Sequence, residues 1–105
     1  MPRFDDLIAG LTGFEWDAGN STKSWERHRV TQAEQEEVFF NQPVLVADAT
    51  AGARERRYTL LGRTNGDRLL SVIFTVRRGL ARPISGRPMS RKERIAYAEV
   101  PPETL

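Results

Sequence analysis

The sequence predicts a small α+β domain in which helices pack on an antiparallel sheet. The chain has 105 residues, enough for one compact domain with one hydrophobic core. Residues 57–87 contain strand-like segments separated by turn sequences. Two capping boxes, which begin at Thr31 and Ser90, mark the starts of helices on either side of those strands.

The N-terminal half predicts one short strand followed by two helices. Residues 14–17 (FEWD) alternate apolar and acidic side chains, as in a strand with one buried face. Residues 19–21 have turn and cap chemistry, so a short polar helix is expected at residues 22–29. The capping box at residues 31–34 begins a second helix, which should end before Pro43 because proline cannot continue a helix.

The C-terminal half predicts a β-meander followed by one helix. Asn65-Gly66 is a strong hairpin signal because both residues tolerate the positive φ of a type I′ turn. Arg78-Gly79 is a second candidate tight turn, and Pro83 places the last strand at a sheet edge or beside a bulge because it has no N–H to donate. Strands are therefore expected at residues 44–47, 57–64, 68–77 and 80–87, and a final helix at residues 91–99.

These elements divide the chain into a flexible leader at residues 1–13, a single domain at residues 14–100 and a tail at residues 101–105. The N-terminus is acidic where a secretion signal is basic, and no apolar run is long enough for a transmembrane helix. The chain has no cysteine, which excludes disulfides, thiolate zinc sites and a cysteine nucleophile. We expect a cytoplasmic protein that does not associate with membranes.

Charge is unevenly distributed along the chain. Residues 1–53 carry four Lys or Arg against nine Asp or Glu, whereas residues 54–105 carry twelve against five. A basic half attracts a polyanion or an acidic protein, because clustered guanidinium groups bind phosphate and release counterions. A solvated basic face is the alternative explanation.

No classical catalytic motif is present: the sequence lacks a nucleophile elbow, a phosphate loop, a zinc-binding pair and a kinase signature. One histidine, several arginines and scattered hydroxyl groups remain. This set suits RNA cleavage without a metal ion or other cofactor, because the 2′-hydroxyl of RNA supplies the nucleophile. The protein then needs a base, an acid and cations that stabilise the phosphorane.

His28 is the candidate for proton transfer. Histidine is the side chain best suited to acid–base chemistry at neutral pH, and His28 is the only one in the chain. The alternative is a structural role. His28 lies at the expected end of a helix, where a positive charge would stabilise the macrodipole by about 0.3–1 kcal/mol.

The register of the meander groups several arginines on one face of the sheet. If the first hairpin loop has only two residues, Arg63 lies opposite Arg68, and Arg57 shares their face. Arg63 and Arg68 would then repel each other unless an anion lies between them. Asp67 and an RNA phosphate are both candidates for that anion.

The second hairpin adds residues from the last strand. If its loop also has only two residues, Ser85 lies opposite Val72 and Arg87 opposite Leu70, on the same face as the first group. Arg82 would lie on the other face. A bulge or a one-residue slip would exchange these assignments.

Aromatic side chains either stack on RNA bases or form the core of a small domain. Trp16 and Phe74 suit a core. Trp25 lies in a polar helix, so the sequence leaves its role open. Tyr97 either exposes a hydroxyl donor or packs against the sheet.

Several short motifs occur in an order and spacing that are specific as a set. They are FEWD at residues 14–17, RHRV at 27–30, GRT at 62–64, FT at 74–75, RPISGR at 82–87, and RKE at 91–93 followed by Tyr97. Together they resemble the BrnT family, the toxin half of bacterial type II toxin–antitoxin pairs. The resemblance runs from about Phe14 to Glu99.

This resemblance implies a RelE-like fold and a metal-independent endoribonuclease that cleaves RNA and inhibits translation. It also implies a cognate BrnA-type antitoxin, which joins a toxin-binding segment to a DNA-binding segment and represses its own operon. Operator DNA would therefore be a partner only through the antitoxin.

The resemblance also supplies the candidate site. The site residues it implies are His28, Arg57, Arg63, Arg82, Ser85 and Arg87. His28 would transfer protons, the arginines would bind phosphate or stabilise the transition state, and Ser85 would orient one of them. Glu15 and Asp17 would hold arginines in place.

Two departures from the family pattern affect the local structure. Arg29 replaces a glycine, so that turn either avoids positive φ or is strained. Gly86 replaces an alanine, which we expect to be a mild change. A catalytically silent binding module of the same fold is the alternative function, and a DNA-binding regulator is a weaker one because no helix-turn-helix is evident.

Overall fold

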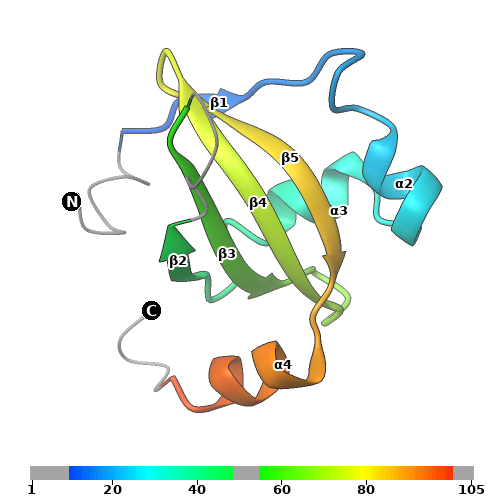
Figure 1. Ribbon diagram of the computed structural model, residues 1–105, viewed down its shortest axis with the longest axis vertical. Coiled ribbons are helices and arrows are strands. Elements are labelled where there is room, and N and C mark those ends of the chain that lie inside the picture. Colours follow the sequence, from blue (N-terminus) through cyan, green and yellow to red (C-terminus); the bar gives the residue numbers. More distant parts are fainter. Residues whose placement is uncertain (1–9, 49–54, 101–105) are drawn as a thin grey trace.

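A five-stranded mixed sheet forms the centre of the computed structural model, which describes residues 10–48 and 55–100 (Figure 1). Strands β2 to β5 form the expected antiparallel meander, and β1 adds to β5 in parallel, which gives the order β1-β5-β4-β3-β2. The α+β prediction is confirmed. The elements are β1 (Gly13–Phe14), α2 (Lys23–His28), α3 (Gln32–Glu37), β2 (Val44–Asp48), β3 (Arg57–Arg63), β4 (Leu69–Arg77), β5 (Leu80–Pro88) and α4 (Arg91–Ala98).

Both predicted capping boxes begin helices. The Thr31 hydroxyl accepts a hydrogen bond from the Glu34 N–H at 3.0 Å, and the Glu34 carboxylate accepts from the Thr31 N–H at 3.0 Å. Ser90 and Glu93 form the same pair of bonds at the start of α4. The helix α3 is shorter than expected, since after Glu37 the chain continues in tight turns rather than in a helix that reaches Pro43.

Helix α2 ends in a left-handed residue. Arg29 has φ 55° and ψ 41°, and its N–H donates to the Trp25 carbonyl at 2.9 Å. Glycine adopts this conformation freely, whereas an L-residue is strained in it by about 1–2 kcal/mol. The turn is therefore strained rather than rearranged.

The β3–β4 hairpin differs from its prediction. Arg63 pairs with Leu69 rather than Arg68, because the loop has three residues instead of two. The Thr64 N–H donates to the Arg68 carbonyl at 2.9 Å, and Asp67 takes the positive φ of 64° that closes such a loop. The predicted type I′ turn at Asn65-Gly66 is wrong, and β4 presents the opposite set of side chains to β3.

The β4–β5 hairpin has the predicted two-residue loop at Arg78-Gly79, where both residues have positive φ. The register then shifts by one residue just after Pro83, which pairs with Phe74 and so lies beside a bulge, as expected of a residue without an N–H. As a result, Ser85 lies opposite Ile73 and Arg87 opposite Ser71. The predicted partners, Val72 for Ser85 and Leu70 for Arg87, are each one residue too early on β4 and are wrong.

The two faces of the sheet pack against different helices. One face carries the main core, in which Phe39 contacts Phe14 and Phe74 edge to face at 5.1 and 4.9 Å between ring centroids. The opposite face carries a small cluster of Leu61, Met89 and Tyr97, which attaches α4 to one end of the sheet (Figure 1). Helix α4 therefore packs on the face of the sheet opposite the main core. The main cluster consists of Val30, Val38, Phe39, Tyr58, Leu60, Leu70, Val72, Phe74 and Ala81.

The N-terminal segment attaches to the outer edge of β5. The Thr12 N–H donates to the Gly79 carbonyl at 2.8 Å, and the Glu15 N–H donates to the Ala81 carbonyl at 2.9 Å. The strand expected at residues 14–17 is limited to Gly13–Phe14. Residues 1–9 and 101–105 lie outside the described residues, so the division into leader, domain and tail stays a prediction. No helix in the described part of the chain has the length and apolar character needed to span a membrane.

Replacement of Gly62 by alanine should destabilise the fold. A Cβ at this position would lie 2.5 Å from Val38 Cγ1 and 2.8 Å from the Val38 carbonyl oxygen, and Val38 is fully buried. Overpacking of this kind costs about 1–3 kcal/mol, so we expect Gly62→Ala to lower the free energy of unfolding by about 2 kcal/mol in urea denaturation.

Gly66→Ala is the matched control for this prediction. The nearest atom to a Cβ there is Thr64 Oγ1 at 3.8 Å, so its effect should stay within about 0.5 kcal/mol. Equal effects of the two substitutions would contradict the packing described for β3 and Val38.

Candidate active site

One face of the sheet carries five arginines and is called here the arginine face. Cross-strand partners point to the same side of a sheet, which places Arg57, Thr75 and Arg82 in one row across β3, β4 and β5. Arg82 was expected on the opposite face, and that prediction is wrong. Because the first loop is one residue longer than expected, the side chains of β4 that share a face with Arg57 are the opposite set from those predicted. Arg82 pairs with one of them, since it lies before the bulge in β5 that shifts the register again. The arginine face consists of Arg57, Arg63, Arg77, Arg82 and Arg87, together with Ser85.

Arg82 is held by two carboxylates. Its guanidinium lies 3.1 Å from Glu15 Oε1 and makes two contacts of 2.9 Å with Asp17, and only 11% of its side chain is exposed. The hydrogen bonds with Asp17 raise the pKa of Arg82. The same bonds, with the Gly19 N–H, lower the pKa of Asp17. The prediction that Glu15 and Asp17 hold arginines is confirmed.

Arg87 is held by the first turn of α4. Its guanidinium makes a two-pronged contact with Glu93 at 2.6 and 3.0 Å, and it donates to the Pro88 carbonyl at 3.2 Å. The hydrogen bonds from Arg87, together with the one from the Ser90 N–H, lower the pKa of Glu93 to about 2. Since 40% of the Arg87 side chain is exposed, a solvent-borne anion can reach it.

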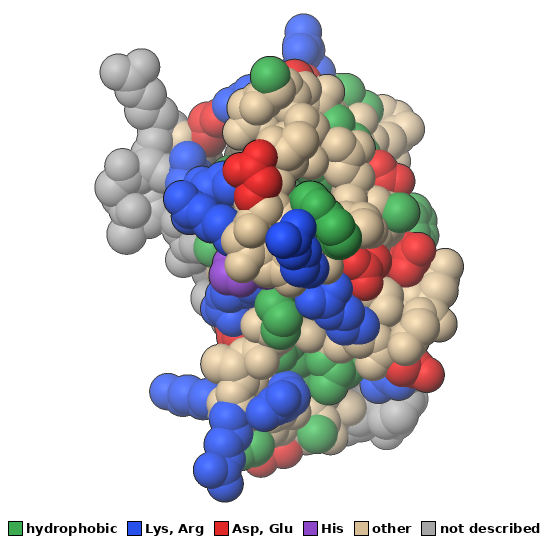
Figure 2. Space-filling model, turned by 90° about the vertical axis from the view of Figure 1, so that its right-hand side faces the viewer, with side chains coloured by type: hydrophobic (Ala, Val, Ile, Leu, Met, Phe, Trp, Pro, Cys, Tyr) green, Lys and Arg blue, Asp and Glu red, His purple; other side chains and the backbone are tan. Residues whose placement is uncertain are grey.

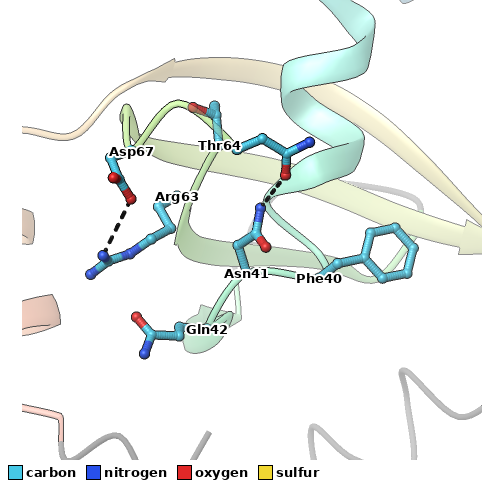
Figure 3. A pocket seen from close by; sticks show the side chains of 7 residues that line it. Phe40, Asn41, Gln42, Arg63, Thr64 and Asp67 are labelled. Atoms are coloured by element: carbon cyan, nitrogen blue, oxygen red, sulfur yellow. Dashed lines mark hydrogen bonds and ion pairs between the residues drawn. The ribbon is translucent and has the colours of Figure 1, made fainter.

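Arg63 lies at the end of β3 near α4, beside an open pocket of about 410 Å³ (Figure 3). Its guanidinium lies 3.5 Å from Asp67 Oδ1 and 5.6 Å from the ring centroid of Tyr97, whose hydroxyl accepts a bond from Nε at 3.4 Å. The hydrogen bond with Tyr97 raises the pKa of Arg63. Of the two anions considered for this arginine, Asp67 is the one in contact with it. The pocket is lined by Phe40, Asn41, Gln42, Arg63, Thr64, Asn65 and Asp67.

Arg68 leaves the arginine face altogether. It follows the hairpin loop, and its guanidinium donates to the carbonyls of His28 and Arg29 at 3.1 and 2.8 Å and to Glu34 at 3.2 Å. The predicted Arg63–Arg68 pair is therefore absent. Instead, Arg68 fixes the C-terminal end of α2, where it satisfies backbone carbonyls that a helix leaves without partners.

His28 is positioned by contacts of α2 with the outer edge of β5. The Ser24 hydroxyl accepts a bond from the Gly86 N–H at 2.7 Å, and both residues are buried. His28 lies four residues after Ser24 and so on the same side of the helix, one turn farther toward the end of β5 that carries Arg87. Figure 2 shows the histidine beside Lys and Arg side chains on this edge of the molecule.

The residues Asn20, Ser24 and Gly86 shape this edge and were not among the predicted site residues. The Asn20 amide donates to the Pro83 carbonyl at 2.7 Å and is buried, next to the bond between Ser24 and Gly86. A Cβ on Gly86 would lie 2.7–2.9 Å from atoms of the buried Gln35 side chain, so the glycine is a spatial requirement and not a mild change. The sequence signal was the pair of small polar residues just before and inside α2.

The six candidate residues therefore occupy three places rather than one. His28, Ser85 and Arg87 lie along the outer edge of β5 near α4. Arg57 and Arg82 lie in one row near the opposite end of the sheet, and Arg63 lies at the end of β3. Among residues 10–48 and 55–100, no three His, Asp or Glu side chains gather closely enough to form a metal-binding group.

The Arg87–Glu93 pair should make stability depend on acid pH. The pKa of Glu93 is about 2 in the folded chain against 4.5 ordinarily, so its stabilising effect is complete above pH 4.5 and is lost as the pH falls toward 2. Glu93→Gln keeps the capping box but removes the charge. Discounted for the exposure of Arg87, the wild type should lose about 1–2 kcal/mol more than this variant between pH 6 and pH 2 in urea denaturation.

Glu99→Gln, an exposed carboxylate at the end of the same helix, provides the control for charge alone. It should follow the wild-type profile. If Glu93→Gln and the wild type lose stability in parallel below pH 4.5, the pair does not act as described.

Comparison with known proteins agrees with the motifs and the architecture. No curated protein matches the chain. The family described as "Ribonuclease toxin, BrnT, of type II toxin-antitoxin system" matches residues 16–93, which include α2, the whole meander and the first turn of α4. The chain belongs to the BrnT family of ribonuclease toxins of type II toxin–antitoxin systems.

Proposed function

We propose that the chain is a metal-independent endoribonuclease whose reaction centre lies along the outer edge of β5. The observation that supports this proposal is the position of His28, which α2 brings beside the strand segment that carries Ser85 and Arg87. A general acid–base group and a guanidinium are thus available to one phosphodiester. RNA supplies the nucleophile, so the protein need not provide one.

The reaction follows from these groups. A base removes the proton from the 2′-hydroxyl, the 2′-oxygen attacks the adjacent phosphorus, and the bond to the 5′-oxygen breaks as that oxygen is protonated. His28 performs one of the two proton transfers, and Arg87 stabilises the charge on the phosphorane. The products are a 2′,3′-cyclic phosphate and a 5′-hydroxyl.

Arg57 and Arg82 have a different role in this proposal. Arg82 and Arg87 pair with Thr75 and Ser71, which are four residues apart on β4, a distance of about 13 Å at 3.3 Å per residue. That exceeds the reach of a single phosphate. Arg57 and Arg82 therefore bind phosphates farther along the RNA, and Arg63 binds a third position beside α4.

The family implies an antitoxin partner and an RNA target, and we propose their finer identities. The antitoxin is of the BrnA type and reaches operator DNA through its own DNA-binding segment, and the free toxin inhibits translation in the cytoplasm. Four of the arginines already contact carboxylates within the chain, namely Arg63, Arg77, Arg82 and Arg87. An antitoxin that covers the arginine face would therefore need to present further acidic groups or exchange with the internal ones.

A silent binding module is the second candidate function. One observation favours it, namely that Arg63, Arg82 and Arg87 each contact a carboxylate of the same chain. A surface with these internal ion pairs can bind a partner without catalysing a reaction.

Cleavage of RNA in the presence of EDTA distinguishes the two. His28→Ala and Arg87→Ala should each lower the cleavage rate by about 100-fold or more, with 2′,3′-cyclic phosphate ends on the wild-type products. Arg78→Asn is the control, since it removes a positive charge at the far tip of the meander and asparagine tolerates positive φ. Its rate should match that of the wild type.

If folded wild type cleaves no RNA, with or without ribosomes, the enzyme proposal is wrong and the binding module takes its place. Cleavage that needs a divalent metal ion would contradict the metal-independent mechanism.

A further inference from the structure

Trp25 is an exposed tryptophan on a basic helix, and the fold gives no packing reason for it. Its side chain is 46% exposed, whereas the indole of Trp16 is half-buried and donates to Glu36 at 2.7 Å. The guanidinium of Arg29 lies 5.1 Å from the centroid of the Trp25 ring, within cation–π range. The remaining surface of the ring is available to a second flat group.

Arg29 holds this arrangement at a cost to the fold. It occupies the left-handed position that ends α2, where glycine would be relaxed. Glycine at this position would leave the Trp25 ring without a cation. The strained residue therefore supplies a guanidinium that the relaxed one cannot.

The surroundings of Trp25 suit a polyanion. Lys23 and Arg27 are exposed on the same helix, and Figure 2 shows the Lys and Arg side chains that gather on this edge of the molecule. At 3.6 residues per turn, Trp25 and Arg27 lie on opposite sides of His28 around the helix. An RNA strand that crosses the end of α2 would therefore meet the Trp25 ring, the His28 imidazole and the Arg27 guanidinium in turn.

From these observations we infer that Trp25 and Arg29 bind an unpaired base of single-stranded RNA, in the nucleotide next to the one whose phosphate is cut. The inference rests on the proposed function. Trp25 and His28 are three residues apart, and residues with this spacing on a helix lie about 5–6 Å apart at Cβ, so the two side chains can reach neighbouring nucleotides of one RNA strand. A base stacked on Trp25 thereby sets which phosphate reaches His28.

The choice of single-stranded RNA follows from the chemistry of the pair. Stacking needs a base whose face is free, which a duplex does not offer, and it is tolerant of base identity. The positive charges add salt-dependent attraction to the backbone. An acidic protein segment presents carboxylates, which are repelled by the negative face of the indole ring rather than stacked on it.

Binding of a 2′-O-methylated RNA oligonucleotide tests the inference without cleavage, because methylation blocks the nucleophile. Trp25→Ala should weaken binding by about tenfold or more, and Trp25→Phe should retain most of it, since stacking contributes about 5- to 150-fold per base. Val46→Ala is the control. Val46 is an exposed apolar residue on β2, at the edge of the sheet opposite β5, so its loss should leave binding unchanged.

Arg29→Gly gives a second, independent test with effects of opposite sign. It should raise the Tm by a few degrees, about 4 °C, because glycine relieves the left-handed strain. It should also weaken binding of the same oligonucleotide severalfold. A residue with only a structural role would not improve stability while it impairs RNA binding.

The outcomes separate this inference from the proposed function. Trp25-dependent binding without any cleavage of unmodified RNA would support the stacking site and overturn the enzyme. Cleavage and binding that are both unchanged in Trp25→Ala would overturn the stacking site and leave the enzyme in place. Equal affinity for duplex and single-stranded oligonucleotides would also overturn it.

Discussion

Two buried hydrogen bonds at the outer edge of β5 determine where the chemistry of this protein can occur. β1 pairs with only the first two residues of β5, so the rest of this strand would expose unpaired backbone groups. Asn20 satisfies the Pro83 carbonyl and Ser24 satisfies the Gly86 N–H, each at 2.7 Å. Because Ser24 belongs to α2, the bonds that close the sheet edge also bring α2, and with it His28, beside that edge. Loss of either bond would leave a backbone group of β5 without its partner and would weaken the attachment of α2 and the segment before it to the sheet.

The carboxylates beside the arginines keep positive charges ordered on a half-exposed surface. Arg82, which is nearly buried, contacts both Glu15 and Asp17, so exchange of its partners for a phosphate would be costly. Arg87 is more exposed and has one acidic partner on a neighbouring helix. The two arginines therefore differ in their readiness to bind a new anion. That difference agrees with a reaction centre at Arg87 and a supporting position at Arg82.

Local sequence signals predicted the fold well where they were sufficient by themselves. The capping boxes at Thr31 and Ser90 and the turn at Arg78-Gly79 formed as expected, because each depends only on neighbouring residues. The loop after Arg63 did not, since its length depends on more distant contacts, including the bond from the Asn65 N–H to Glu37 at 2.9 Å.

The candidate site could be predicted only in part for the same reason. The prediction that Arg57, Arg63, Ser85 and Arg87 share a face agrees with the structure, but it does so because two register errors cancel. The first error is the longer loop and the second is the bulge after Pro83, and Arg82 lies between them. Side chains alternate between the two faces of a strand, so a one-residue error in any hairpin moves every residue of the following strand to the other face. The internal carboxylate partners also could not be derived from spacing, since Glu15 and Arg82 are far apart in the chain.

The close approach of Gln35 to Gly86 couples the side chains that these two positions can hold. Gln35 fills the space that an alanine side chain at position 86 would occupy, and it is almost completely buried. Alanine at position 86 would fit only if position 35 on α3 already held a smaller side chain, because with Gln35 in place its Cβ would clash next to α2. The two positions can therefore change only in a restricted order. A substitution tested at one of them alone does not show which substitutions this edge accepts when the other also changes. Relatives that differ at one of them should differ at the other.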